Sequence, residues 1–554
     1  MAEPEPVRPD TAPGFVPLDD SGLPHTLDGL LSRAAAARPG HHAVVTAERA
    51  MTFAELDASA STLAGVLCAR LTGRRQVVAV AAALDPDFAV AYFAVARGGH
   101  VAAVVNPLLR EDDLAHVLNL SGARAAFVDA GLYPRLAAVR DRLPELEHVF
   151  LLGPDGQPAG AAESFPEHLA ELLAAAPPGP TARAAEPAPD DTACLHFTSG
   201  TTGRPKGVRL SHRNLVVNAR QIAVAHALDG TSVTVNHLPT YHPMHLNSAI
   251  HALATQVLCT NPDPSASVLA ANQYRATHLY SLPFRLARLA RDERLPGLRL
   301  DTVAHIASGG SALAPDHATR LSEHFGVHVF QGYGLAETSP LTHSDDPHEP
   351  LPGSVGRPVA GTECRVVDVD RRRRLPAGET GEVQVRGPQV MRGYLGAPEG
   401  SGVAPDGWFS TGDVGRIGPD GRLFLVDRLK DVFKYHNWLV SPSETERVLR
   451  QHPLVADCVV FDHPEDDAGA VAHALLVLRP GAGAGGSAGP EDVAEVCRLA
   501  NSRLPYFQQV RYAEAVSSIP RSPNGKVRRR ELRDRYLGAP GDTVEVPGAA
   551  AVPR

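Results

Sequence analysis

The 554-residue chain lacks several features that would place it in a common functional class. It has no excess of basic residues, because 53 Lys and Arg are outnumbered by 62 Asp and Glu, which gives a net charge of −9 at pH 7. This balance argues against a nucleic-acid-binding protein, which uses positive charge to meet phosphates. Aromatic residues make up only 5% of the chain, yet 44% hydrophobic and 21% charged residues are typical of a folded protein.

Long apolar runs are also missing. The longest apolar tract, Val77–Val105, is interrupted by Asp85, Asp87, Arg97 and two glycines, so it falls short of the roughly 20 apolar residues that span a bilayer. The acidic, proline-rich first 17 residues lack the basic start and apolar core of a secretory signal. The six cysteines are far apart and show no CxxC spacing. We therefore expect a cytoplasmic protein with reduced thiols and no membrane contact.

Glycine and proline, in contrast, are abundant, with 49 and 48 residues. Many of them gather in four stretches, Ala174–Pro189, Gly396–Gly407, Pro480–Pro490 and Gly538–Arg554. We interpret these stretches as loops, a linker and a tail, since the composition around them is that of folded segments.

Strand and helix patterns alternate through the first three quarters of the chain. The expected strands are Val77–Leu84, Val101–Asn106, Ala125–Asp129, Val149–Leu152, Cys194–Thr198, Val233–Leu238, His278–Leu282, Val303–Ala307 and Val327–Gln331. The expected helices are Thr52–Leu71, Arg110–Leu120, Ser211–Leu228, Phe284–Arg291 and Pro315–Phe325. This alternation predicts an α/β fold of mostly parallel sheets with helices on both faces.

The pattern changes twice near the C-terminal end. Three strand-like runs without helices predict a β-rich subdomain: Cys364–Val369, Glu382–Arg386 and Leu423–Val426. After Arg428 the pattern predicts a compact α+β unit with helices Ser441–Gln451 and Pro490–Ser502 and strands Cys458–Phe461 and His473–Leu478. We therefore expect an N-terminal core at residues 20–427, a small mobile C-terminal domain at 428–537, and flexible tails at 1–19 and 538–554.

The most specific stretch for chemistry is Thr198–Val208, which lies between an expected strand and the helix that Ser211 opens. Its small hydroxyl residues and glycines allow backbone N–H groups to converge on an anion, and Lys206 adds a mobile positive charge. These features predict a phosphate-binding loop. It is not a Walker A loop, because the required glycine–lysine–serine/threonine spacing is absent.

With four further motifs in order, the chain resembles the adenylate-forming superfamily of acyl-CoA synthetases, aryl-CoA ligases and peptide-synthetase adenylation domains. The motifs are Gly332–Thr338, Ser410–Asp413, Asp427–Asp431 and Pro520–Lys526. The resemblance covers about Leu27 to Leu532. It implies that ATP is a substrate and that Mg²⁺ is a cofactor.

The resemblance also implies a role for each matching residue. It assigns nucleotide binding to Thr198, Ser199, Gly200, Thr201, Thr202, Gly203, Lys206, Gly310, Ser311, Gln331, Gly332, Tyr333, Gly334, Asp413 and Arg428. Glu337 would hold Mg²⁺, which prefers one or two carboxylates beside phosphate oxygens. Lys526 would neutralise charge on the reacting phosphate, a kind of contribution worth about 10²–10³ in rate. Lys430 would be the hinge of the C-terminal domain.

The segment Leu238–Asn247 resembles the family's aromatic–histidine segment, in which His242 matches the family position and counts among the catalytic candidates together with Lys434. The resemblance assigns the acid pocket to Tyr241, His242, His245, Asn247, Ser308 and Gly309. So polar a wall favours a small or functionalised acid over a long fatty chain.

Three positions depart from the family pattern. Ala336 replaces the usual Thr or Ser and removes a hydrogen-bond donor to phosphate, worth about 1.5–3 kcal/mol. Beyond the hinge, Asn437 replaces a glycine beside which the pantetheine arm of CoA would run, and Leu439 replaces a glutamine. A side chain at 437 obstructs that path, or else asparagine only adopts the same left-handed backbone.

The sequence therefore predicts an ATP- and Mg²⁺-dependent ligase, monomeric or homodimeric, that converts a small or aryl acid into its adenylate and transfers it to a thiol, by family default CoA. Two alternatives stay open. One keeps adenylation but uses a carrier protein, an amine or, as in ATP-dependent diazotases, nitrite chemistry. The other is a non-catalytic nucleotide-binding regulator, which Ala336 favours.

Overall fold

The computed structural model describes residues 15–153, 166–176, 187–199, 204–436, 438–465, 469–479, 490–521, 527, 529–537 and 544–546. The chain divides into two compact units, each with hydrophobic cores of its own. The first comprises Met1–Arg365, Gln384–Ser410 and Gly418–Leu423, and the second comprises Val366–Val383, Thr411–Ile417 and Phe424–Arg554. The domain boundary expected at residue 427 stays a prediction.

The first unit contains two large sheets. The nine-stranded sheet has the order β16 (Arg357–Pro358), β15 (Leu341–Ser344), β14 (His328–Gly334), β13 (His305–Ser308), β12 (His278–Ser281), β10 (Val233–Asn236), β11 (Thr255–Leu258), β1 (His42–Val45) and β2 (Ala50–Thr52). Its strands from β14 to β1 are parallel, while β15, β16 and β2 pair antiparallel at the edges.

The seven-stranded sheet has the order β7 (Glu167–His168), β6 (His148–Leu152), β5 (Ala123–Asp129), β3 (Val77–Ala81), β4 (Val101–Val104), β8 (Thr192–Ser199) and β9 (Pro205–Ser211). All of its pairs are parallel except the last. The middle strand β3 reads Val-Val-Ala-Val-Ala and is almost wholly buried, as expected of a parallel strand covered on both faces.

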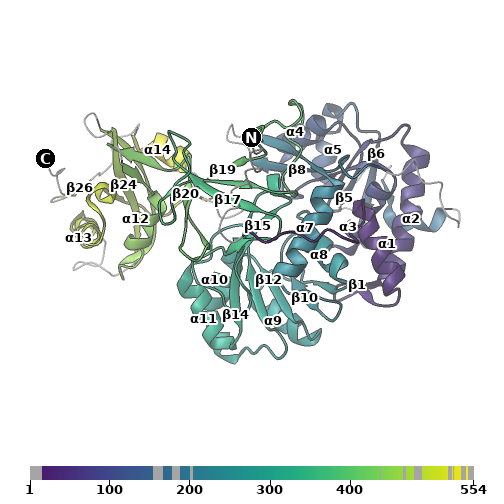
Figure 1. Ribbon diagram of the computed structural model, residues 1–554, viewed down its shortest axis with the longest axis horizontal. Helices are drawn as coiled ribbons and strands as arrows, with labels where there is room; N and C mark the ends of the chain where they lie inside the picture. Colours follow the sequence, from purple (N-terminus) through teal and green to yellow (C-terminus); the bar gives the residue numbers. More distant parts are fainter. Residues whose placement is uncertain are drawn as a thin grey trace, which may run out of the picture. The chain divides into compact units, whose positions relative to one another are not determined.

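Helices cover both sheets, and α7 and α8 lie between them (Figure 1). The helices of this unit are α1 (Leu27–Ala37), α2 (Phe53–Arg70), α3 (Pro86–Arg97), α4 (Glu111–Ser121), α5 (Tyr133–Ala138), α6 (Leu169–Ala175), α7 (His212–Ala225), α8 (Met244–Ala252), α9 (Pro264–Gln273), α10 (Pro283–Arg291) and α11 (Pro315–Phe325). This arrangement confirms the predicted α/β fold with mostly parallel sheets.

One prediction about local structure was wrong. Residues Pro205–Ser211 form strand β9, paired antiparallel with β8, where the sequence suggested a loop leading directly into a helix. Val208 and Leu210 are buried on one face of this strand, and burial of these two side chains favours a hairpin. The expected phosphate loop therefore joins two antiparallel strands, so a helix N-terminus does not follow it directly.

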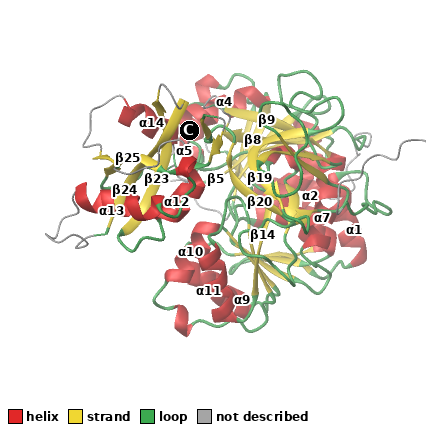
Figure 2. Ribbon diagram, turned by 60° about the vertical axis from the view of Figure 1, so that its left-hand side comes forward, coloured by secondary structure: helices red, strands yellow, loops and turns green. Residues whose placement is uncertain are grey.

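The second unit is built on a six-stranded sheet with the order β22 (Trp438–Val440), β21 (Phe433–Tyr435), β24 (Gly469–Leu478), β25 (Val510–Ala515) and β26 (Val544–Glu545), in which β23 (Val455–Glu465) also pairs with β24. Figure 2 shows this sheet with its helices α12 (Pro442–Leu449), α13 (Pro490–Asn501) and α14 (Arg529–Leu537). A separate four-stranded sheet has the order β17 (Glu363–Val367), β18 (Gly381–Arg386), β19 (Phe409–Ile417) and β20 (Leu423–Arg428), which confirms the predicted β-rich region.

Within the described residues, no helix is both long and apolar enough to cross a bilayer. All six cysteines are free thiols, and every one except Cys68 is buried.

Candidate active site

Several residues that the motifs assign lie at the carboxyl edge of the nine-stranded sheet. Strand β13 ends at Ser308 and leads into a turn containing Gly309 and Gly310, while its neighbour β14 carries Gln331 in register with Ser308. The Gln331 Oε1 atom accepts a 2.7 Å hydrogen bond from the backbone N–H of Leu313, which fixes the turn against β14. Because ligands of open α/β sheets bind at this edge, the turn lies where a ligand is expected.

The turn after β13 is open on one side. Gly310 has a φ of +87°, a left-handed conformation that favours glycine, and a Cβ at Gly309 or Gly310 would meet no atom closer than 3.8 Å. Ser311 beside it is exposed. An exposed turn of this kind can present backbone N–H groups to an anion, as the predicted nucleotide site requires.

The candidate magnesium ligand follows β14 in the short helix η3 (Ala336–Thr338). The chain turns tightly before it, since a Cβ at Gly334 would lie 1.9 Å from the Pro340 carbonyl oxygen. The Glu337 side chain is buried, and its Oε1 atom accepts a 3.0 Å hydrogen bond from the Tyr394 hydroxyl. A carboxylate has two oxygens, so it can accept this proton and still ligate a cation.

Tyr394 links Glu337 to the phosphate-loop lysine. The Lys206 Nζ atom lies 5.4 Å from the centroid of the Tyr394 ring, within cation–π range. Burial, with the Glu337 charge, raises the pKa of Tyr394 above its ordinary value, so the phenol stays protonated and donates. Tyr394 was missed at the sequence level, because it follows Glu337 by 57 residues and no spacing joins the two; its one signal is an aromatic residue directly after Gly393.

The strands around the phosphate loop place its two ends together. Thr198 is in register with Lys206, and Ser199 with Pro205, so the lysine stands at the mouth of the loop. The predicted loop residues themselves lie outside the described residues: Gly200, Thr201, Thr202 and Gly203.

The aromatic–histidine segment runs between β10 and α8. The rings of Tyr241 and His242 are 4.7 Å apart, and His242 lies 6.1 Å from the ring of His196 on β8. Tyr241 is buried, whereas His242 is exposed. His242 can therefore reach a substrate at the edge of the sheet.

The structure separates the other residues assigned to the acid pocket. His245 stacks on Tyr280 with ring centroids 4.1 Å apart, while Asn247, two residues further along α8, donates a 3.2 Å hydrogen bond to the Tyr92 hydroxyl on α3. Ser308 belongs to the opposite strand face from Tyr280, because successive residues of a strand alternate in direction. These three residues thus do not share one wall.

Asp413 and Arg428, the expected ribose residues, form an ion pair. The Arg428 Nε atom lies 2.7 Å from Asp413 Oδ1, and the Asp413 side chain is 6% exposed. The backbone N–H of Asp413 also donates to Thr411 Oγ1 at 3.1 Å. The pair is thus held in place from strand β19.

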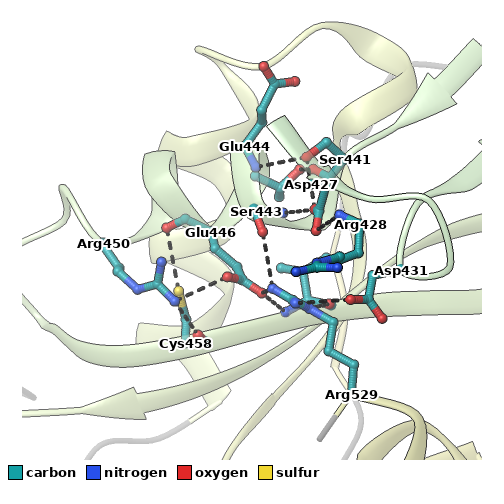
Figure 3. A network of polar contacts seen from close by, with 12 residues as sticks. Asp427, Arg428, Asp431, Ser441, Ser443, Glu444, Glu446, Arg450, Cys458 and Arg529 are labelled. Atoms are coloured by element: carbon teal, nitrogen blue, oxygen red, sulfur yellow. Dashed lines mark hydrogen bonds and ion pairs between the residues drawn. The ribbon is translucent and has the colours of Figure 1, made fainter. Parts of the chain in front are cut away.

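Two carboxylates on either side of the candidate hinge Lys430 bind the body of the second unit (Figure 3). Asp427 accepts hydrogen bonds from Ser441 Oγ at 3.0 Å and from the backbone N–H of Ser443 at 2.9 Å, at the start of α12. Asp431 lies 3.9 Å from Arg529, and burial raises the pKa of Asp431. Lys430 itself is exposed between them.

Arg529 is the centre of this network. It donates to Glu446 Oε1 at 2.7 Å, to Ser443 Oγ at 3.2 Å and to the Val460 carbonyl at 3.2 Å. Of the other candidates in this unit, Lys434 pairs with Asp370. Two lie outside the described residues, the catalytic candidate Lys526 and the departure at Asn437.

Comparisons with known proteins decide the family. The model of the AMP-binding enzyme family matches residues 31–395, and that of the AMP-binding enzyme C-terminal domain matches residues 444–526. The chain belongs to the AMP-binding enzyme family.

Relatives of this AMP-binding enzyme extend over most of its length. A 4-coumarate–CoA ligase-like protein of Oryza sativa subsp. japonica is 34% identical over 80% of this chain and 75% of its own. ATP-bound MatB from Rhodopseudomonas palustris is 28% identical, with a TM-score of 0.80 over 92% of this chain and 99% of its own. The amide bond synthetase McbA from Marinactinospora thermotolerans is 27% identical, with a TM-score of 0.78 over 92% and 100%.

These matches confirm the resemblance to adenylate-forming enzymes and the predicted class of AMP-forming ligase, and they do not favour the non-catalytic alternative. The site in this AMP-binding enzyme also fits the expected groups. The buried Glu337 carboxylate, the nearby Lys206 cation and the exposed glycine turn provide the oxygen ligand, the positive charge and the backbone donors that Mg²⁺ and a triphosphate require.

Proposed function

We propose that this AMP-binding enzyme is a cytoplasmic ligase that activates a small or aromatic carboxylic acid with ATP and passes the acyl group to CoA. The observation that carries this proposal is the convergence of Glu337 and Lys206 on Tyr394, in a chain that matches the family over both of its domains.

In the first half-reaction, a carboxylate oxygen of the acid attacks the α-phosphorus of ATP and pyrophosphate leaves. Lys206 and the turn at Gly309–Ser311 bind phosphate oxygens, and Asp413 with Arg428 holds the ribose hydroxyls. Mg²⁺ held by Glu337 would offset the charge of the phosphates. Lys526 would stabilise the charge that develops at the α-phosphate, and His242 would line the approach of the acid.

In the second half-reaction, the CoA sulfur attacks the acyl carbon of the adenylate and AMP leaves. We propose that the C-terminal domain turns about Lys430 between the halves, which replaces Lys526 by the segment around Lys434. Closure of the site in each half keeps water from the reactive adenylate.

A screen of carboxylic acids for pyrophosphate release, with and without CoA, tests the proposal. We expect at least one aromatic acid to give pyrophosphate, and CoA to increase AMP release and yield the thioester. Pyrophosphate release with no CoA effect for any acid would rule out the thioester step. In that case an amine would be the acceptor, as the name of the amide bond synthetase relative suggests.

A further inference from the structure

An unusual group of histidines lies between the nine-stranded sheet and the helices α7 and α8. On the sheet, His278, His305 and His328 are in register on one face, and the next residues on that face are Tyr280, Ala307 and Phe330. Two histidines from the helices cover this second row: His226 at the end of α7 and His245 on α8.

Close ring contacts join the two helix histidines to the sheet. The ring of His245 stacks on Tyr280 at 4.1 Å, and the ring of His226 lies 5.1 Å from Phe330 and 5.5 Å from Tyr280. His226 Nδ1 is 3.0 Å from the Tyr280 hydroxyl. These residues form one buried aromatic layer, which we call the histidine floor: His226, His245, Tyr280 and Phe330.

The floor has polar groups that its own side chains do not satisfy. His226 Nε2 and His245 Nδ1 are buried and have no hydrogen-bond partner within the described part of the chain, and the residues are only 3% and 6% exposed. Such atoms are costly to bury unless a ligand or a water completes them.

His278 shows that this lack is specific. It belongs to the adjacent row, but its Nε2 lies 2.9 Å from the His226 carbonyl and its Nδ1 lies 2.8 Å from Thr277 Oγ1. Because a carbonyl only accepts, His278 Nε2 donates and Nδ1 accepts from the threonine hydroxyl. His278 is thus a satisfied core histidine, whereas His226 and His245 are not.

The floor lies below the proposed acid site. Gly309 is the residue after next from Ala307 along β13, so it lies about 7 Å higher on the same face, a distance close to the length of an aromatic ring. A Cβ at Gly309 would meet nothing closer than the Gly332 carbonyl oxygen at 3.8 Å. An aromatic acid bound beside Gly309 can therefore direct its far end toward the floor.

The chemistry of the floor selects the kind of substituent. Burial lowers the pKa of His245 to about 3 and that of His226 well below its usual value, so both rings are neutral at pH 7. Neutral imidazoles offer hydrogen bonds but no charge to balance a second carboxylate, which is costly to bury unpaired. A hydroxyl or amino group fits such a site, and the flat faces of Tyr280 and Phe330 suit an aromatic ring.

We propose that His226 and His245 determine substrate specificity, and that the acid is aromatic with a hydroxyl or amino group on its ring. This inference rests on the proposed ligase function. The test compares kcat/KM for acid-dependent pyrophosphate release with benzoate, 3- and 4-hydroxybenzoate, 3- and 4-aminobenzoate, cinnamate, 4-hydroxycinnamate and terephthalate.

We expect at least one hydroxyl- or amino-substituted acid to exceed its unsubstituted parent by about tenfold or more, because a site built to hydrogen-bond a substituent rejects the analogue without it. Terephthalate should be the poorest of the benzoates. In His245→Phe the preference should fall toward one, while the parent acid keeps its own kcat/KM within about threefold.

His226→Phe serves as the second variant, and His100→Phe is the matched control. His100 is also a buried histidine with unpartnered ring nitrogens, but it precedes β4 of the other sheet, so its replacement should leave the preference unchanged. Because each preference is a ratio within one variant, a partial loss of folded protein does not alter it.

Pyrophosphate release with no preference for a substituent, or a preference unchanged in both floor variants, would overturn this inference and leave the proposed function standing. Failure of every acid to give pyrophosphate would instead overturn the proposed function, and this inference with it.

Discussion

At the scale of single residues, Tyr394 joins two charges that belong to separate motifs. Its hydroxyl donates to Glu337 and its ring faces Lys206. We predict that Tyr394→Phe raises the KM for MgATP about five- to tenfold, since a hydrogen bond to a charged group contributes about 1.5–3 kcal/mol and this one is half-buried. Steady-state kinetics at varied Mg²⁺ measures the change.

Tyr274→Phe is the control for this prediction, because the Tyr274 hydroxyl donates to the Thr46 carbonyl on the far strands of the nine-stranded sheet. An unchanged KM for MgATP in Tyr394→Phe would show that Glu337 does not depend on the phenol for its position.

At the scale of elements, Asp85 caps α3 at a cost that depends on pH. Its Oδ1 accepts a 2.8 Å hydrogen bond from the Asp87 backbone, but burial raises its pKa from 3.8 to about 6. The folded state thus holds the proton more tightly than the unfolded state, so this contribution is full below pH 4 and is lost as the pH rises through about 6. Asp85→Asn keeps a good cap and removes the penalty.

We therefore predict that Asp85→Asn raises the free energy of unfolding at pH 7.5 by about 1–2 kcal/mol and has little effect at pH 4. Chemical denaturation at the two pH values measures the difference. Equal effects at both pH values would mean that the Asp85 carboxyl titrates normally in the folded protein.

Also at this scale, Arg529 anchors the start of α14, three residues after Lys526. Arg529→Ala leaves the buried Glu446 with only Arg450, at 3.1 Å, so we expect a loss of about 2–3 kcal/mol in the stability of the C-terminal domain. We also expect about a tenfold drop in kcat for pyrophosphate release, with the KM values for ATP and acid unchanged, because the proposed binding residues lie elsewhere.

Arg529→Lys should recover part of the activity, and Arg535→Ala, on the exposed face of the same helix, should match the wild type. An increase in the KM for ATP in Arg529→Ala would contradict a role confined to positioning Lys526.

The sequence predicted elements well where one local pattern decided them. The almost continuous apolar residues of β3 and the periodicity of α11 identify a buried strand and an amphipathic helix without outside information. Strand β9 was missed, because its polar start at Lys206 is typical of a loop and only pairing with β8 makes it a strand. Tyr394 and the Asp427 contact with α12 were missed because both depend on long-range folding.

At the scale of the whole molecule, the two half-reactions require different positions of the C-terminal domain. Proline at the candidate hinge fixes its own φ and restricts Leu429 before it. We predict that Lys430→Pro lowers CoA-dependent AMP release at least tenfold but leaves acid-dependent exchange of pyrophosphate into ATP within about threefold. Lys430→Ala should preserve both, and an equal loss of both halves in Lys430→Pro would argue against a hinge at this residue.

The central claim is that this chain adenylates an acid with the help of Lys526, and acid-dependent exchange of labelled pyrophosphate into ATP tests it most directly. The account predicts exchange in the wild type, a loss of about 10²-fold or more in Lys526→Ala, and wild-type exchange in Arg528→Ala beside it. No exchange with any acid, or equal exchange in Lys526→Ala and the wild type, would contradict it.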